Sequence, residues 1–130
     1  MNHVIEHYFD EIESQLLQSS IIISYQIVRR EIGPIDGKLR LKATLKDGGF
    51  MELFEYVTES NGVIQTAKYS FHWQNEVGKL KKRWDNAPHF PNLPNPPHHV
   101  HLEDGTVHEM FTIPNMLYVI EQIEESIEKG

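Results

Sequence analysis

The longest regular pattern in this chain is an alternation of apolar and polar residues over positions 63–74. Its apolar face holds Val63, Ala67, Tyr69, Phe71 and Trp73. A period of two residues is typical of a β-strand with one buried face and one face in water. Segments 38–46 and 50–58 alternate in the same way, and glycine-containing turns at 47–49 and 61–62 join the three segments. The chain is therefore constrained to fold around antiparallel hairpins.

Two further segments are expected to extend this sheet to about five strands. Segment 21–31 is rich in Ile, Val and Tyr, and segment 79–86 follows a turn at the end of the long alternation. Apolar residues recur at helical spacing over 3–18 and 114–128, and acidic residues occupy the other faces. We therefore expect an α+β fold, in which an antiparallel sheet carries an N-terminal and a C-terminal helix. With no linker or repeat in sight, residues 1–130 are expected to form a single domain.

The region between the last expected strand and the C-terminal helix is rich in proline. Five prolines lie within 87–97, and each removes a backbone donor, so this segment is expected to be a loop. Segments 100–102 and 106–111 could add a short strand or hairpin around Asp104-Gly105.

Charge is distributed unevenly along the chain. The net charge is −7, but residues 38–83 hold nine Lys/Arg against five Asp/Glu, whereas the rest holds three basic and fourteen acidic residues. This asymmetry suggests a face for an anionic ligand, although basic strands could instead pair with the acidic helices. The sequence shows no signal peptide, no membrane span and no cysteine, so we expect a cytoplasmic protein with no membrane partner.

The hairpin that follows segment 63–74 allows a prediction of strand register. If Asn75 pairs with Gly78 across a two-residue loop, His72 faces Lys81, Ser70 faces Arg83 and Lys68 faces Asp85 on one side of the sheet. The other side then pairs Tyr69 with Trp84 and Trp73 with Leu80.

The resulting strip of polar side chains suggests a surface for single-stranded RNA. Cations neutralise phosphates and exposed rings such as Phe54 and Tyr56 stack on bases, provided that the neighbouring hairpin presents the same face. The candidate RNA-binding residues are Arg40, Lys42, Lys68, Ser70, Lys81, Asn86 and His89. An ordinary solvated sheet face is the alternative.

Clustered histidines suggest that this strip could also cleave RNA. Cleavage without a metal requires a base for the 2′-hydroxyl proton, an acid for the leaving oxygen and a cation at the phosphate. The candidate catalytic residues are His72, Arg83, Asp85, His98 and His99. We expect no cofactor and no metal, because no helical HExxH spacing occurs. A metal-dependent hydrolase using His98, His99 and His101, with Asp85 or Glu103, is an alternative.

The strip also carries a family resemblance. The segments Tyr69-Ser70-Phe71-His72-Trp73-Gln74, Arg83-Trp84-Asp85-Asn86-Ala87-Pro88-His89 and Pro97-His98-His99, together with Leu80, resemble the signature of the TumE family. That resemblance implies a toxin of a type II toxin–antitoxin pair, acting on RNA and neutralised by a cognate antitoxin with a helix-turn-helix domain. Phe90 departs from the pattern, because many relatives are expected to have a second histidine after His89. A non-catalytic RNA- or protein-binding module fits the same residues, and a homodimer is left open.

Overall fold

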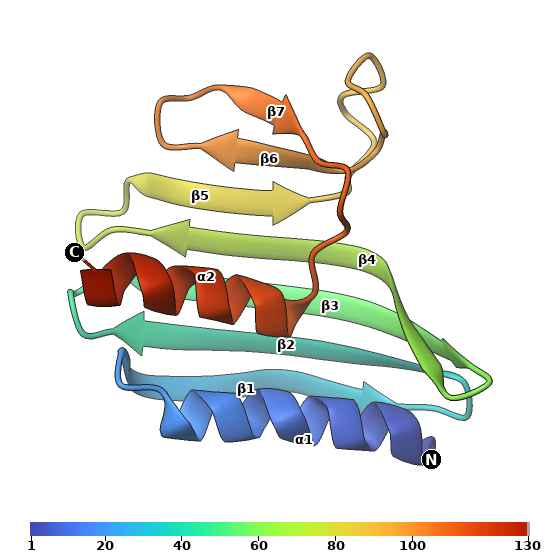
Figure 1. The fold of residues 1–130 in the computed structure, drawn as a ribbon. Coiled ribbons are helices and arrows are strands. Elements are labelled where there is room, and N and C mark those ends of the chain that lie inside the picture. The colour runs from blue at the N-terminus through green and yellow to red at the C-terminus, as the bar shows by residue number, and fades with distance from the viewer. Residues whose placement is uncertain (130) are drawn as a thin grey trace.

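The computed structural model describes residues 1–129 and consists of one layer of strands and one layer of helices. Seven antiparallel strands lie side by side in chain order, from β1 to β7 (Figure 1). The strands are β1 (Ile22–Ile32), β2 (Asp36–Leu45), β3 (Phe50–Ser60), β4 (Val63–Gln74), β5 (Leu80–Asp85), β6 (His99–Leu102) and β7 (Val107–Glu109). The helices are α1 (His3–Gln18) and α2 (Met116–Lys129). Each strand is thus connected to its neighbour by a hairpin or loop, as the alternating segments predict.

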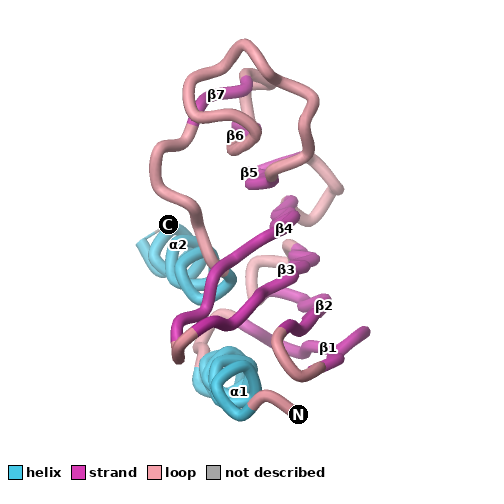
Figure 2. Tube along the Cα trace, turned by 90° about the vertical axis from the view of Figure 1, so that its right-hand side faces the viewer, coloured by secondary structure: helices cyan, strands magenta, loops and turns pink. Residues whose placement is uncertain are grey.

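Both helices lie on the same side of the sheet, which leaves the other side to solvent (Figure 2). The apolar stripe predicted for α1 is buried, namely Ile5, Phe9, Ile12 and Leu16. It packs with the odd-numbered residues of the central strands, such as Leu41, Leu53 and Phe71, all of which are fully buried. We call the helix-covered side the inner face and the opposite side the outer face. The core therefore lies between the sheet and the helices, and only the outer face can hold a solvent-facing site over the strands.

The α+β class with two terminal helices is confirmed, but the expected number of strands is too small. The structure has seven strands because residues 99–102 and 107–109 form β6 and β7 beyond β5. β6 is four residues long and β7 is three, too short for a clear alternation to appear in the sequence, although segments 100–102 and 106–111 are indicated by the sequence as a possible hairpin around Asp104-Gly105. The C-terminal helix also begins later than 114, because Asn115 caps it by accepting a hydrogen bond from the Tyr118 amide at 2.9 Å.

The predicted register between β4 and β5 is wrong by two residues. The structure pairs Ser70 with Asp85 and His72 with Arg83, not with Arg83 and Lys81. The turn contributes one residue of this shift, because Asn75 pairs with Lys79 across a three-residue loop that ends at Gly78, whose φ is 85°. The other comes from a bulge in β5 at Lys81. Successive side chains of a strand point to opposite faces, so a total shift of two residues leaves Arg83 and Asp85 on the predicted face of the sheet.

One carboxyl group lies on the inner face, within the core. Glu55 is fully buried, and its oxygens accept hydrogen bonds from the hydroxyls of Tyr8 and Thr66 and from the backbone amide of Met116. Burial raises the pKa of Glu55, against the opposing effect of these three donors. Glu55 therefore connects α1, two strands and the first turn of α2.

In the described residues, neither helix has the length and hydrophobicity needed to span a lipid bilayer.

Candidate functional site

The site is built from two rows of side chains that cross the outer face at right angles to the strands. Directly paired residues of adjacent strands point to the same side of a sheet, so each row shares one face. The first row consists of Lys42, Glu52, His72, Arg83 and His101, one from each of β2 to β6. The second consists of Arg40, Phe54, Ser70, Asp85 and His99. Arg40, Lys42 and Phe54 therefore share the outer face with His72. The RNA-binding hypothesis requires this arrangement of the neighbouring hairpin.

Arg83 lies at the centre of the site and is held in place by the second row. Its Nε donates to Asp85 Oδ2 at 3.1 Å, and its second terminal nitrogen donates to Ser70 Oγ at 2.8 Å. The remaining terminal nitrogen lies 3.5 Å from His72 Nδ1. The guanidinium is thus fixed on two sides and keeps one edge toward His72, an arrangement that suits recognition of a phosphate.

Asp85 and His99 form a buried pair beneath this guanidinium. His99 Nε2 donates to Asp85 Oδ1 at 2.8 Å, and both side chains are less than a tenth exposed. His99 Nδ1 lies 2.8 Å from the carbonyl oxygen of Pro97, while the Ala87 amide donates to Asp85 Oδ1 at 3.0 Å. Both ring nitrogens of His99 thus face oxygen acceptors. Because every polar atom of the pair has a partner, the pair is rigid and positions Arg83.

His101 completes the first row on the far side of Arg83. Its Nε2 lies 3.6 Å from Asp85 Oδ2, and its ring packs edge-on against Phe90 with 5.7 Å between ring centroids. Burial lowers the pKa of His101; Asp85 opposes that effect, and the nearby His99 and Arg83 add to it. Its side chain is nevertheless 27% exposed, so it is accessible from solvent.

On the other side of Arg83, His72 is oriented by a neighbour on its own strand. Its Nε2 donates to Gln74 Oε1 at 2.8 Å. This contact leaves Nδ1 facing the guanidinium. The two imidazoles of the first row therefore flank the central cation.

The structure does not bring His98 into this site. His98 precedes β6 and points to the inner face, where its Nδ1 lies 3.0 Å from the hydroxyl of Tyr69 and its ring stacks on the tyrosine ring. Burial, and secondarily His99, lower its pKa. Adjacent residues of an extended segment point to opposite sides, so only one of the pair His98 and His99 could reach the outer face. His101, two residues beyond His99, takes the place next to Arg83.

Four of the candidate RNA-binding residues lie outside the two rows, and three of these, Lys81, Asn86 and His89, also lie away from the depressions beside them. Lys81 occupies the bulge, where its Nζ is 5.6 Å from the centre of the Trp73 ring and 3.6 Å from Glu103. Asn86 uses both ends of its amide on the backbone of β4: Oδ1 accepts from the Tyr69 amide and Nδ2 donates to the Ala67 carbonyl. His89 is exposed in the proline-rich loop. Asn86 therefore holds two strands together in this structure.

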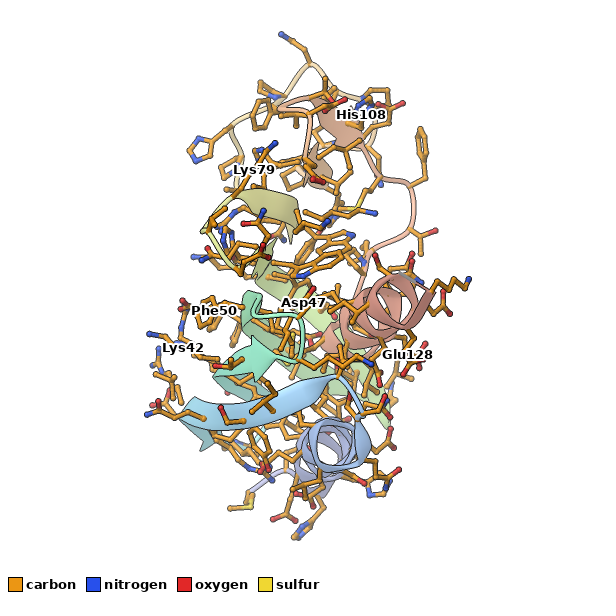
Figure 3. The ribbon with its side chains drawn as sticks, turned by 90° about the vertical axis from the view of Figure 1, so that its left-hand side faces the viewer. Lys42, Asp47, Phe50, Lys79, His108 and Glu128 are labelled. Atoms are coloured by element: carbon orange, nitrogen blue, oxygen red, sulfur yellow. The ribbon has the colours of Figure 1, made fainter. Side chains whose placement is uncertain are left out.

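The remaining candidates extend the site across the sheet. A depression of about 570 Å³ includes Arg40, Phe54, Tyr56, Lys68 and Ser70 among its lining residues. Lys68 is paired with Tyr56, not with Asp85 as the expected register had it. Arg40 lies 4.6 Å from the ring centre of Phe54 and forms an ion pair with Glu52. Lys42 is exposed and projects with Phe50 away from α2 (Figure 3). Cations and rings thus continue from Arg83 toward β2.

The same cluster contains a set of metal-type donors. One donor atom each from Asp85, His99 and His101 lies within 4.8 Å of the others. This set differs from the His98, His99 and His101 group expected from the sequence, because His98 lies on the inner face. The Arg83 guanidinium is hydrogen-bonded to the same carboxylate, however, and its charge would repel a second cation there.

Fold and site define a small α+β protein with a cationic, histidine-containing site on the open face of its sheet. A comparison with protein families agrees with this class: the family described as Toxin TumE matches residues 12–129. The chain belongs to the TumE toxin family, which places it among the toxins of toxin–antitoxin systems and implies an antitoxin partner. Searches of curated proteins and of solved structures returned no match.

Proposed function

We propose that this toxin is a metal-independent endoribonuclease. The observation that supports this proposal is the first row, in which Arg83 lies between two imidazoles on adjacent strands. Neighbouring strands are about 4.8 Å apart, so the two histidine backbones are separated by about 10 Å. A phosphodiester bound at Arg83 would have His72 on one side and His101 on the other.

In the proposed reaction His101 acts as the base and His72 as the acid. The lowered pKa of His101 favours the unprotonated ring that a base requires. His101 takes the proton of the 2′-hydroxyl, and the 2′-oxygen attacks phosphorus. The bond to the 5′-oxygen then breaks, and His72 gives that oxygen a proton. The products are a 2′,3′-cyclic phosphate and a 5′-hydroxyl.

The other groups of the site bind or position. Arg83 stabilises the charge that develops on the phosphate, and the Asp85–His99 pair holds Arg83 in place. Arg40, Lys42 and Lys68 neutralise flanking phosphates, and Phe54 and Tyr56 offer rings for stacking bases. The RNA would therefore cross the strands from β6 toward β2.

The cognate antitoxin is proposed to be a helix-turn-helix protein encoded beside the toxin, as the resemblance to the family suggests. A partner that covers the first row would block access of RNA to Arg83. Coexpression with the neighbouring gene should then restore growth to cells that express the toxin.

The test is cleavage of a single-stranded oligoribonucleotide in EDTA by purified, antitoxin-free protein. We expect cyclic-phosphate products, which disappear when the scissile nucleotide carries a 2′-deoxy sugar or when His72 or His101 is replaced by alanine. His108→Ala is the matched control, because His108 is an exposed histidine on β7 whose partner Val100 faces the core. Intact RNA with folded protein would indicate a binding module instead. Cleavage that requires added divalent metal would favour a hydrolase using the donor set of Asp85, His99 and His101.

A further inference from the structure

A carboxylate interrupts the cationic outer face beside the proposed reaction centre. Glu52 lies directly opposite His72 in the first row, between that histidine and Lys42. A carboxylate at this position repels the phosphates that the neighbouring cations attract. Its Oε2 accepts from Arg40 at 2.9 Å, but the side chain remains 34% exposed. The ion pair therefore leaves Glu52 able to accept further hydrogen bonds.

Glu52 belongs to a depression of about 460 Å³ on this face. Four of its lining residues form a square of paired neighbours, in which Phe50 faces Gln74 and Glu52 faces His72. Phe50 offers a ring, Glu52 offers acceptors, and Gln74 offers an amide whose oxygen is already bonded to His72. Within the described residues, Gln74 Nε2 has no hydrogen bond, so a donor is also present. The volume is in the range of pockets that hold small ligands.

This combination of groups matches the Watson–Crick edge of one nucleobase. Guanine presents N1–H and its 2-amino group side by side, which two carboxylate oxygens accept together, next to an O6 acceptor for an amide donor. Adenine and cytosine each present one amino group beside a ring nitrogen acceptor, and uracil presents one N–H between two carbonyls. These three bases would each place a lone pair against the carboxylate.

We propose that the depression formed by Phe50, Glu52, His72 and Gln74 is a guanine-binding subsite. The base stacks on Phe50, its N1–H and 2-amino group donate to Glu52, and Gln74 donates to O6. The 5′-phosphate of the same nucleotide then lies toward His72 and Arg83, so this guanosine carries the 5′-oxygen that His72 protonates. This assignment rests on the proposed function, since it names the base next to the bond that is cleaved.

The test is binding of the four nucleoside 5′-monophosphates, none of which contains a cleavable phosphodiester, to the full chain by calorimetry. We expect 5′-GMP to bind about tenfold more tightly than the other three. Glu52→Gln should bind all four with similar affinity. Its affinity for the other three should rise slightly, because a negative charge has been removed. The amide keeps the shape of the side chain and its contact to Arg40, and circular dichroism would verify the fold.

Glu103→Gln is the matched control, since Glu103 is also a partly exposed carboxylate beside a cation, Lys81, but lies outside the depression. It should retain the preference for 5′-GMP. Equal binding of the four nucleotides to the unaltered protein, or a preference that survives Glu52→Gln, would overturn the subsite. RNA that stays intact while the preference holds would instead overturn the ribonuclease and leave the subsite standing.

Discussion

His72 and His101 lie on the two strands that flank β5, and each is paired directly with Arg83. The relationship comes from the backbone, because three antiparallel strands in register place one residue from each in a single row. The second row then fixes the side chain at the centre through Ser70 and Asp85. The geometry of the site is thus determined by strand pairing, not by a mobile loop.

Replacement of Arg83 by lysine should reduce cleavage by about 100- to 1000-fold. A single ammonium cannot donate to Ser70 and Asp85 and still face the phosphate, so the cation loses its position although its charge is kept. The measurement is the single-turnover rate on a fluorescent oligoribonucleotide. Arg30→Lys is the control, because Arg30 also donates to two carboxylates, those of Asp10 and Glu13 on α1. A rate equal to that of the unaltered protein would exclude Arg83 from the reaction.

The cleavage rate should remain high to a pH below 6.5 and then fall as the pH decreases further. Burial lowers the pKa of His101 from its usual 6.5; Asp85 acts against this shift, and His99 and Arg83 act with it. Since a base must be unprotonated, the rate falls about tenfold per pH unit once the pH is below this lowered pKa.

Phe90→Ala tests the cause of this shift. The Phe90 ring packs against His101, so its removal admits water and should raise the pKa of His101 toward 6.5. The acidic limb of the rate profile should then move to higher pH. Phe111→Ala removes an aromatic ring that is 73% exposed and should leave the profile unchanged. A profile that does not respond to Phe90→Ala would indicate that another group produces the limb.

The faces of the central strands could be predicted from the sequence because a period of two is local information, except in the first half of β4. There a bulge at Ala67 reverses the alternation, so that Val63 is exposed and Thr66 reaches the buried Glu55, contrary to the predicted apolar face. Register is not local, since it depends on the length of the turn and on bulges. The turn after Asn75 is one residue longer than expected, and Lys81 is an extra residue for which the sequence carries no signal. Each irregularity shifts the register by one residue, and a total shift of two does not change the face of a side chain. The predicted shared face is therefore correct for His72, Ser70, Arg83 and Asp85, although the predicted partners are wrong.

Residues 98–101 show that strand pairing supplies information that an alternating sequence pattern lacks. Alternation predicts that His99 and His101 share a side and that His98 points away. The pairing of β6 with β5 is needed to show that His99 and His101 lie on the same face as Arg83 and Asp85. His101 is therefore missing from the predicted catalytic group, and Glu52 is not among the predicted site residues. The alternation of His99 and His101 is the sequence signal by which His101 could have been identified.

Removal of the buried carboxyl group should destabilise the fold. Glu55→Ala leaves two hydroxyls and the Met116 amide without their acceptor, at a cost of about 2–4 kcal/mol in the free energy of unfolding. Glu55→Gln keeps an acceptor for the amide and should cost much less. Urea unfolding followed by fluorescence measures both. Equal losses in the two variants would show that the hydrogen bonds are not the cause.

The same residue should make stability depend on pH. Because burial raises the pKa of Glu55 in the folded chain, the folded state binds more protons than the unfolded state above the usual value of 4.5. The contribution of this residue to the unfolding free energy is therefore largest below pH 4.5 and is lost as the pH rises through the raised pKa. Glu55→Gln cannot titrate, so the difference in unfolding free energy between the two proteins should change with pH in this direction. A difference that is constant with pH would contradict the assignment.

Asn86 and Lys68 should separate stability from RNA binding. Asn86→Ala removes two hydrogen bonds to the backbone of β4 and should cost about 1–2 kcal/mol of unfolding free energy, while leaving RNA affinity unchanged. Lys68→Ala removes an exposed cation from the depression beside Tyr56 and should weaken binding. The slope of log affinity against log salt should also become less steep by about 0.7 in that variant, since one phosphate contact to a single strand is lost. Fluorescence anisotropy with a labelled oligoribonucleotide at several salt concentrations, beside urea unfolding, measures both quantities. A loss of affinity in Asn86→Ala at unchanged stability would place Asn86 in contact with RNA and remove it from the set of residues that hold β4 and β5 together.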